Sequence, residues 1–82
     1  MLMVVGNLPD DITEAGIREA LGADAPVDRI KLLKEGLAPF ALVEIRMTAE
    51  PARGLARRVH GSVYGGRALT AWLPLPGWTK VQ

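Results

Sequence analysis

The chain has 82 residues, enough for one small domain, and it shows no internal repeat, low-complexity tract or second domain. Because 49% of the residues are apolar, we expect a compact core rather than disorder. Cysteine is absent, which excludes disulfides, thiolate metal sites and thiol nucleophiles from this sequence. Ten Lys and Arg offset by nine Asp and Glu leave a net charge of +1. A surface that binds phosphates would therefore have to come from clustered charges.

No apolar run approaches the roughly 20 residues that a membrane helix needs. The first residues also lack the basic region and the cleavage site of a signal peptide. We therefore expect no membrane partner and a cytoplasmic location.

The first half of the chain predicts strand, helix and strand. Residues 1–5 are too few and too apolar for an amphipathic helix and fit a buried strand better. After a turn, Thr13 is a good N-cap for a helix that Gly22 ends. Residues 27–33 then alternate between apolar and polar side chains, which is typical of a strand.

The second half repeats the pattern in the order strand, helix, strand. Residues 40–46 alternate with a period of two, and Thr48 begins a helix that Gly61 stops. The segment Tyr64-Gly65-Gly66 turns the chain, and residues 68–73 form the last predicted strand. Residues 74–82 contain Pro and Gly and are predicted to be a C-terminal tail that follows the domain of residues 1–73.

This order of elements predicts an α+β fold, a ferredoxin-like βαββαβ sandwich. In this fold, four antiparallel strands form one sheet and both helices cover one of its faces. We expect the strands at residues 2–5, 28–33, 40–46 and 68–73, with the first and the third strand central. Because the helices leave the other face of the sheet open, that face is the natural place for a binding site.

Four segments in this order and spacing together resemble the RNA-recognition motif family over residues 2–73. Met3-Val4-Val5-Gly6-Asn7-Leu8 is similar to the family's six-residue ribonucleoprotein motif on the first strand. Phe40-Ala41-Leu42-Val43-Glu44-Ile45 is similar to the latter part of its eight-residue motif on the third strand. Gly61 and the segment Gly66-Arg67-Ala68-Leu69 match the family's usual ending.

The resemblance implies that bases stack on aromatic side chains of the central strands. The positions that carry this role over are Val4, Phe40 and Leu42, and only Phe40 has a ring. The eight-residue motif usually opens with a basic residue and a glycine, where this sequence has Ala38 and Pro39. The departures therefore fall on binding positions and not on core positions.

Trp72 offers a replacement for the missing ring. If Leu69 and Ala71 face the core, strand alternation places Thr70 and Trp72 on the open face. The last strand lies beside the first in this topology, so Trp72 should neighbour Val4. Trp72 then either stacks on a base or fills space under the tail, and the sequence leaves both open.

The cations divide into those near the open face and those behind it. Lys31 and Arg46 share the open-face alternation and could bind phosphates, or they could solvate the face and pair with Glu44. Arg67, at the turn into the last strand, is a further candidate for a nucleic-acid contact. The arginines of the second helix lie behind the sheet and are expected to form a solvated helix face: Arg53, Arg57 and Arg58.

The sequence gives little support for catalysis. His60 and Ser62 are the only His and the only Ser, and they lie in a turn at a helix end, where loop chemistry explains them. Asp10 and Asp11 fit a turn and a helix N-terminus better than an acid pair. With one His and no Cys, we predict no metal site, no cofactor and no enzymatic activity.

The predicted function is weak binding of single-stranded RNA on the open sheet face. The sites predicted for it are Val4, Lys31, Phe40, Leu42, Arg46, Arg67, Thr70 and Trp72. The alternative is a protein-interaction or self-association module that uses the same apolar face. Trp78, in the tail, could fold back over the sheet or bind another protein, and the sequence favours neither.

Overall fold

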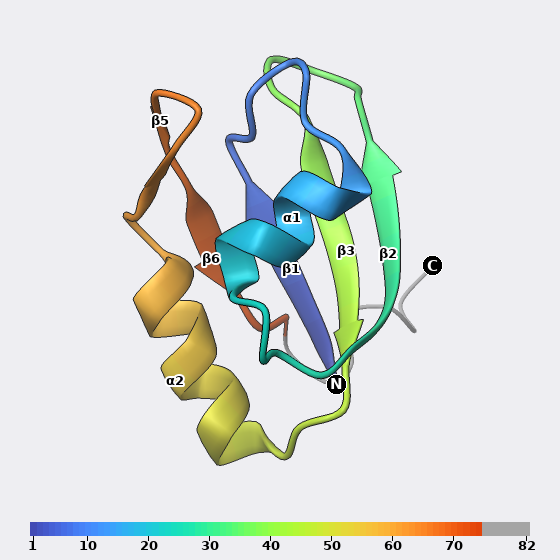
Figure 1. Cartoon of the computed structure of the whole chain (residues 1–82), viewed down its shortest axis with the longest axis vertical. Helices are drawn as coiled ribbons and strands as arrows, with labels where there is room; N and C mark the ends of the chain where they lie inside the picture. The colour runs from blue at the N-terminus through green and yellow to red at the C-terminus, as the bar shows by residue number, and fades with distance from the viewer. Residues whose placement is uncertain (75–82) are drawn as a thin grey trace.

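The computed structural model describes residues 1–74 (Figure 1). Trp78 and the other residues of the predicted tail from 75 to 82 lie outside the described residues. The helices of the described part are too short or too polar to span a membrane. The elements are β1 (Leu2–Gly6), α1 (Glu14–Leu21), β2 (Val27–Leu33), β3 (Phe40–Ile45), α2 (Ala49–Val59), β4 (Val63–Tyr64), β5 (Arg67–Ala68) and β6 (Thr70–Trp72).

The main sheet has four strands in the order β2-β3-β1-β6, and every neighbouring pair is antiparallel. Figure 1 shows α1 and α2 on the same side of this sheet. This arrangement confirms the predicted α+β architecture with β1 and β3 in the centre. The opposite face of the sheet carries neither helix and is called the open face below.

The core lies between the sheet and the helices. Met3 and Val5 of β1 point into it and are completely buried, as is Ile17 of α1. From α2, Leu55 and Val59 close the core. Because side chains alternate along a strand, burial of Met3 and Val5 places their neighbours in β1 on the open face.

The ends of α1 follow the sequence signals. The hydroxyl of Thr13 accepts a hydrogen bond from the N–H of Gly16 at 3.1 Å. Gly22 ends the helix with φ of 106°, a conformation that favours glycine, and its N–H donates to the carbonyl of Arg18. Thr48 holds the corresponding N-cap position of α2, but its side chain makes no capping hydrogen bond within the described residues.

The prediction of one continuous last strand over residues 68–73 is wrong. Arg67 and Ala68 form β5, which pairs with β4 in a separate two-stranded hairpin, and the main sheet receives only β6. The cause is the turn at Gly65 and Gly66, whose φ angles are 60° and 82°. Positive φ at both central residues is the geometry of a tight hairpin turn, so the chain folds back on β4 before it reaches the sheet.

Candidate nucleic-acid interface

The strand register sets the side chains of the open face in rows across the sheet. In one row, Lys31 of β2 lies opposite Leu42 of β3, which lies opposite Val4 of β1, and Val4 lies opposite Trp72 of β6. This confirms the predicted proximity of Trp72 and Val4. On one side of this row, Leu33 lies opposite Phe40 and Gly6 opposite Thr70; on the other, Glu44 lies opposite both Arg29 and Leu2.

Gly6 occupies the place between the two aromatic side chains. A methyl group added to Gly6 would lie 3.9 Å from Cβ of Phe40 and 4.0 Å from ring carbon Cζ3 of Trp72. It would also lie 2.7 Å from Oγ1 of Thr70, which is too close for an unshifted structure. The missing side chain at Gly6 therefore leaves room for the hydroxyl of Thr70, while Phe40 and the Trp72 ring approach this point of β1 from the two neighbouring strands.

Trp72 and Val4 differ in what they offer to a ligand. Trp72 is 50% exposed, whereas Val4 is only 4% exposed. Val4 therefore forms part of the floor of the open face rather than a contact surface. Leu42 and Phe40 are half-buried, which leaves part of each side chain accessible. The accessible aromatic surface consequently lies over β3 and β6, with β1 between them.

The other end of the open face carries compensated charges. Nε of Arg29 lies 3.2 Å from Oε1 of Glu44, and Nε of Arg46 lies 2.6 Å from Oδ1 of Asp28. Arg46 thus pairs with a carboxylate, although not with the one the sequence suggested. Lys31 has no hydrogen bond or ion pair with any residue of the described chain.

Arg29 was not among the predicted site residues, although the alternation that selected Lys31 also selects it. The structure places both beside a shallow hollow of about 190 Å³, together with Leu2, Leu42 and Glu44. An irregularity in the pairing of β2 with β3, between Val27 and Arg29, sets this placement. Arg29 and Glu44 are therefore part of the candidate interface.

Arg67 lies outside the rows of the open face. It belongs to β5, and its guanidinium donates to Oδ1 of Asn7 at 3.0 Å. The amide of Asn7 in turn donates to the carbonyl of Ala68 at 2.8 Å. Asn7 has φ of 58°, the left-handed conformation that Asn tolerates better than most residues. These contacts attach the β4–β5 hairpin to the end of β1.

The side chains of His60, Ser62 and Tyr64 each make a hydrogen bond within the described part of the chain. Nδ1 of His60 accepts a hydrogen bond from the N–H of Ala71 at 3.1 Å, and the hydroxyl of Ser62 donates to the carbonyl of Val59 at 2.6 Å. A hydrogen bond to Glu19, at 2.9 Å, is the main cause that raises the pKa of Tyr64 above its usual 10.0. Within residues 1–74, no group of three or more His, Cys, Asp or Glu side chains could hold a metal ion.

No protein-family model and no curated protein matches the sequence. Solved structures do match the fold. The Mip6 RRM3 domain is 14% identical, with 87% of this chain and 88% of that chain covered and a TM-score of 0.75. The Rna15 RRM with bound RNA (GU) is 20% identical, with 96% and 92% covered and a TM-score of 0.70.

The chain has an RRM-like fold. A third similar structure, the C. elegans NONO-1 homodimer, is 22% identical and has a TM-score of 0.76; the match covers 93% of this chain but 29% of that chain. The RRM-like fold confirms the architecture that the sequence resemblance implied. What the open face binds depends on the side chains described above.

Proposed function

We propose that this RRM-like domain binds single-stranded RNA weakly on its open sheet face and does so without catalysis. The observation that carries the proposal is the placement of Phe40 and Trp72 on that face, beside the bare backbone of Gly6. RRM domains bind RNA by stacking bases on aromatic side chains of the sheet. In this chain the second ring comes from β6 instead of β1, so the stacking surface is displaced toward the sheet edge.

A similar solved structure also supports RNA binding. The Rna15 RRM shares this fold over nearly the whole chain and carries bound RNA. A sequence identity of 20% supports a shared fold but not shared RNA contacts. The contacts proposed here therefore rest on the side chains of this chain alone.

The charges and rings of the face imply a modest affinity. Each stacked base contributes roughly 1–3 kcal/mol, and Phe40 and Trp72 offer one surface each. Arg29 and Arg46 already pair with carboxylates, which leaves Lys31 as the cation of the face without a partner among residues 1–74. Two stacked bases and a few phosphate contacts correspond to dissociation constants that are micromolar or weaker.

The test is a fluorescence anisotropy titration of labelled, mixed-sequence single-stranded RNA at several salt concentrations. We expect saturable binding whose logarithmic salt slope is about −1.5 to −2 for a short RNA, because each of two or three neutralised phosphates contributes about −0.7. A slope steeper than about −4 would reveal a basic surface that this proposal lacks. The absence of binding at low salt would refute RNA binding.

A second candidate function uses the same face for protein association. Leu2, Leu33 and Leu42 are half-buried and apolar, and contiguous exposed apolar surface marks interaction sites. The similarity to the structure of a NONO-1 homodimer adds to this possibility. Size-exclusion chromatography of the free protein distinguishes the candidates, since self-association predicts an elution volume that depends on concentration and a monomer does not.

A further inference from the structure

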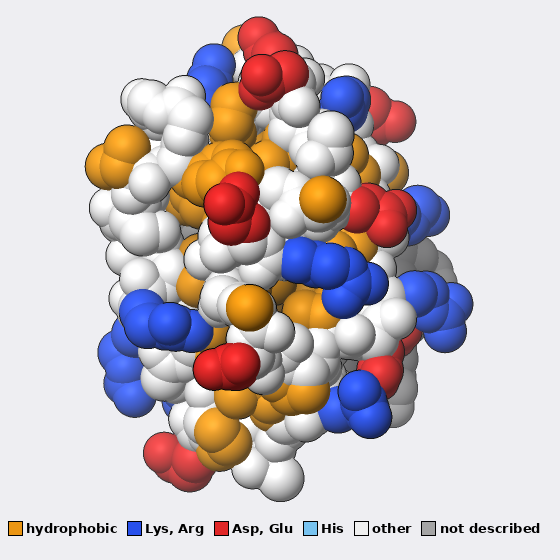
Figure 2. Space-filling model, in the orientation of Figure 1, with side chains coloured by type: hydrophobic (Ala, Val, Ile, Leu, Met, Phe, Trp, Pro, Cys, Tyr) orange, Lys and Arg blue, Asp and Glu red, His pale blue; other side chains and the backbone are white. Residues whose placement is uncertain are grey.

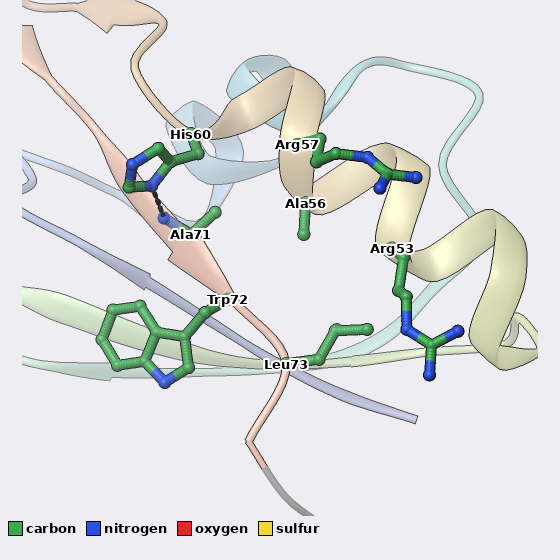
Figure 3. Close-up of a pocket in the computed structure, with 7 residues that line it drawn as sticks. All are labelled: Arg53, Ala56, Arg57, His60, Ala71, Trp72 and Leu73. Atoms are coloured by element: carbon green, nitrogen blue, oxygen red, sulfur yellow. Dashed lines mark hydrogen bonds between the residues drawn. The ribbon is translucent and has the colours of Figure 1, made fainter.

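A groove of about 450 Å³ separates α2 from the edge strand β6 (Figure 3). Arg53, Ala56 and Arg57 line it from α2, and Ala71, Trp72 and Leu73 line it from β6 and the residue that follows. His60 closes one end. Figure 2 shows Lys and Arg side chains gathered over α2, where the second helix carries its arginines. The groove therefore combines an apolar floor with a cationic wall.

The polar side chains of this groove are donors. Because Nδ1 of His60 accepts from the N–H of Ala71, a neutral His60 carries its proton on Nε2, which is then a donor. Within residues 1–74, Arg57 makes no ion pair or hydrogen bond, and the only ion pair of Arg53 is with Glu50, at 3.1 Å on the exposed helix surface. None of the described residues that line the groove is acidic. A ligand rich in acceptors and negative charge is the chemical complement.

Several backbone groups along and next to the sheet edge already have partners, which disfavours a peptide that adds as a further strand. The carbonyl of Leu69 accepts from the N–H of Gly61 at 2.7 Å, and the N–H of Leu69 donates to the carbonyl of Ser62 at 2.8 Å. His60 takes the N–H of Ala71. Strand addition needs these groups free, because main-chain hydrogen bonds supply its affinity.

The groove borders the open face at Trp72. Trp72 is one of the residues that line the groove, and its ring approaches Gly6 on the open face. Figure 3 shows the indole on the side of β6 away from α2, whereas His60, Arg57 and Arg53 lie on the helix side. A strand that stacks on Trp72 and continues past the sheet edge would enter the groove.

We propose that single-stranded RNA leaves the open face over Trp72 and places its next phosphates in the α2–β6 groove, where Arg57 and Arg53 bind them. This inference rests on the proposed function and adds a second, electrostatic part to the site. It assigns a ligand to arginines that the sequence alone assigned to a solvated helix face. The aromatic surface would hold bases, and the groove would hold the backbone that follows them.

The test compares two lengths of RNA on two matched variants. Arg57→Gln removes a charge from the groove, and Arg18→Gln removes one from the exposed face of α1. Glutamine retains high helix propensity, so both variants should keep the fold, and circular dichroism with a thermal melt checks this. The RNAs have about three nucleotides, which the sheet alone can stack, and about six, which extend beyond it.

We expect Arg57→Gln to weaken binding of the longer RNA about three- to fivefold, as the loss of one exposed charge pair implies. Its salt slope should become shallower by about 0.7, the contribution of one phosphate. The shorter RNA should bind both variants with the affinity that it has for the native chain. Arg18→Gln should leave the affinity for both RNAs unchanged. The double variant Arg53→Gln, Arg57→Gln should enlarge the loss for the longer RNA only.

Three results would overturn the proposal. If native protein binds both RNAs and Arg57→Gln behaves like Arg18→Gln, the groove is not on the RNA path, although the open face still binds. If native protein binds neither RNA, the proposed function fails together with this inference. If a glutamate-rich peptide binds in an Arg57-dependent way and the longer RNA does not, the groove serves an acidic protein partner instead.

Discussion

Replacement of Trp72 by alanine separates a stacking role from a packing role, because the side chain is 50% exposed. The exposed half is the surface available to a base, and loss of one stacked base costs roughly 1–3 kcal/mol. We therefore expect Trp72→Ala to weaken RNA binding about five- to hundredfold. Trp72→Phe, which keeps a ring at this position, should lose less.

The buried half of Trp72 sets the effect on stability. Burial of a large aromatic side chain removes about 150–250 Å² from water, so half of it corresponds to roughly 75–125 Å². At about 25 cal/mol per Å², the variant loses at most about 2–3 kcal/mol in the free energy of unfolding. The free energy of unfolding of an 82-residue chain is typically about 4–12 kcal/mol, so the variant remains mainly folded without denaturant.

The assay pairs urea denaturation with anisotropy titration of the same samples. Ile17→Val in α1 serves as a control, because it trims a completely buried side chain far from the open face and costs about 0.5–1.5 kcal/mol of stability. We expect it to bind RNA as the native chain does. If Trp72→Ala binds RNA with native affinity, the stacking role is refuted. If both variants lose RNA affinity equally, the loss reflects reduced stability and not stacking.

Other predictions address the charged end of the face, the β1 turn and α1. Glu44→Gln removes a negative charge and releases Arg29 from its ion pair, so RNA affinity should rise about two- to fivefold in anisotropy titrations; a fall would show that Glu44 contacts a base. Asn7→Ala should lower the free energy of unfolding by about 1–2 kcal/mol in urea, because it loses a hydrogen bond to the β4–β5 hairpin and strains a φ of 58°, whereas Asn7→Gly should lose less. The pKa of Tyr64 is raised in the folded state by its hydrogen bond to Glu19, so its contribution to stability is present below pH 10 and should be lost as pH rises through the raised pKa. Thermal melts of Tyr64→Phe should lack this alkaline component, and an unchanged pH profile would contradict the assignment.

The order of the elements and the position of Trp72 could be predicted from local information. A period of two identifies each long strand, caps identify the helix α1, and the topology then places β6 beside β1. These rules suffice to place Trp72 opposite Val4. They depend only on residues near in sequence and on a known arrangement of strands.

Other features depend on contacts between distant segments and could not be predicted. The turn at Gly65 and Gly66 could be predicted, but the pairing of Arg67 and Ala68 with β4, which divides the last strand, could not. The partner of Arg46 is Asp28 because the two strands meet at an irregular register near Val27. The groove between α2 and β6 likewise lies between two separate segments, and nothing in their sequence spacing predicts a groove there.

The most direct test of RNA binding on the open face is an NMR titration of the isotopically labelled chain with short single-stranded RNA. RNA binding on the open face predicts that amide signals of Gly6, Phe40 and Leu42 shift together with the indole N–H signal of Trp72, whereas signals of α1 stay in place. Fast exchange between free and bound signals would fit the expected micromolar or weaker affinity. Shifts confined to the helices, or no shifts at RNA concentrations in the millimolar range, would contradict RNA binding by this sheet.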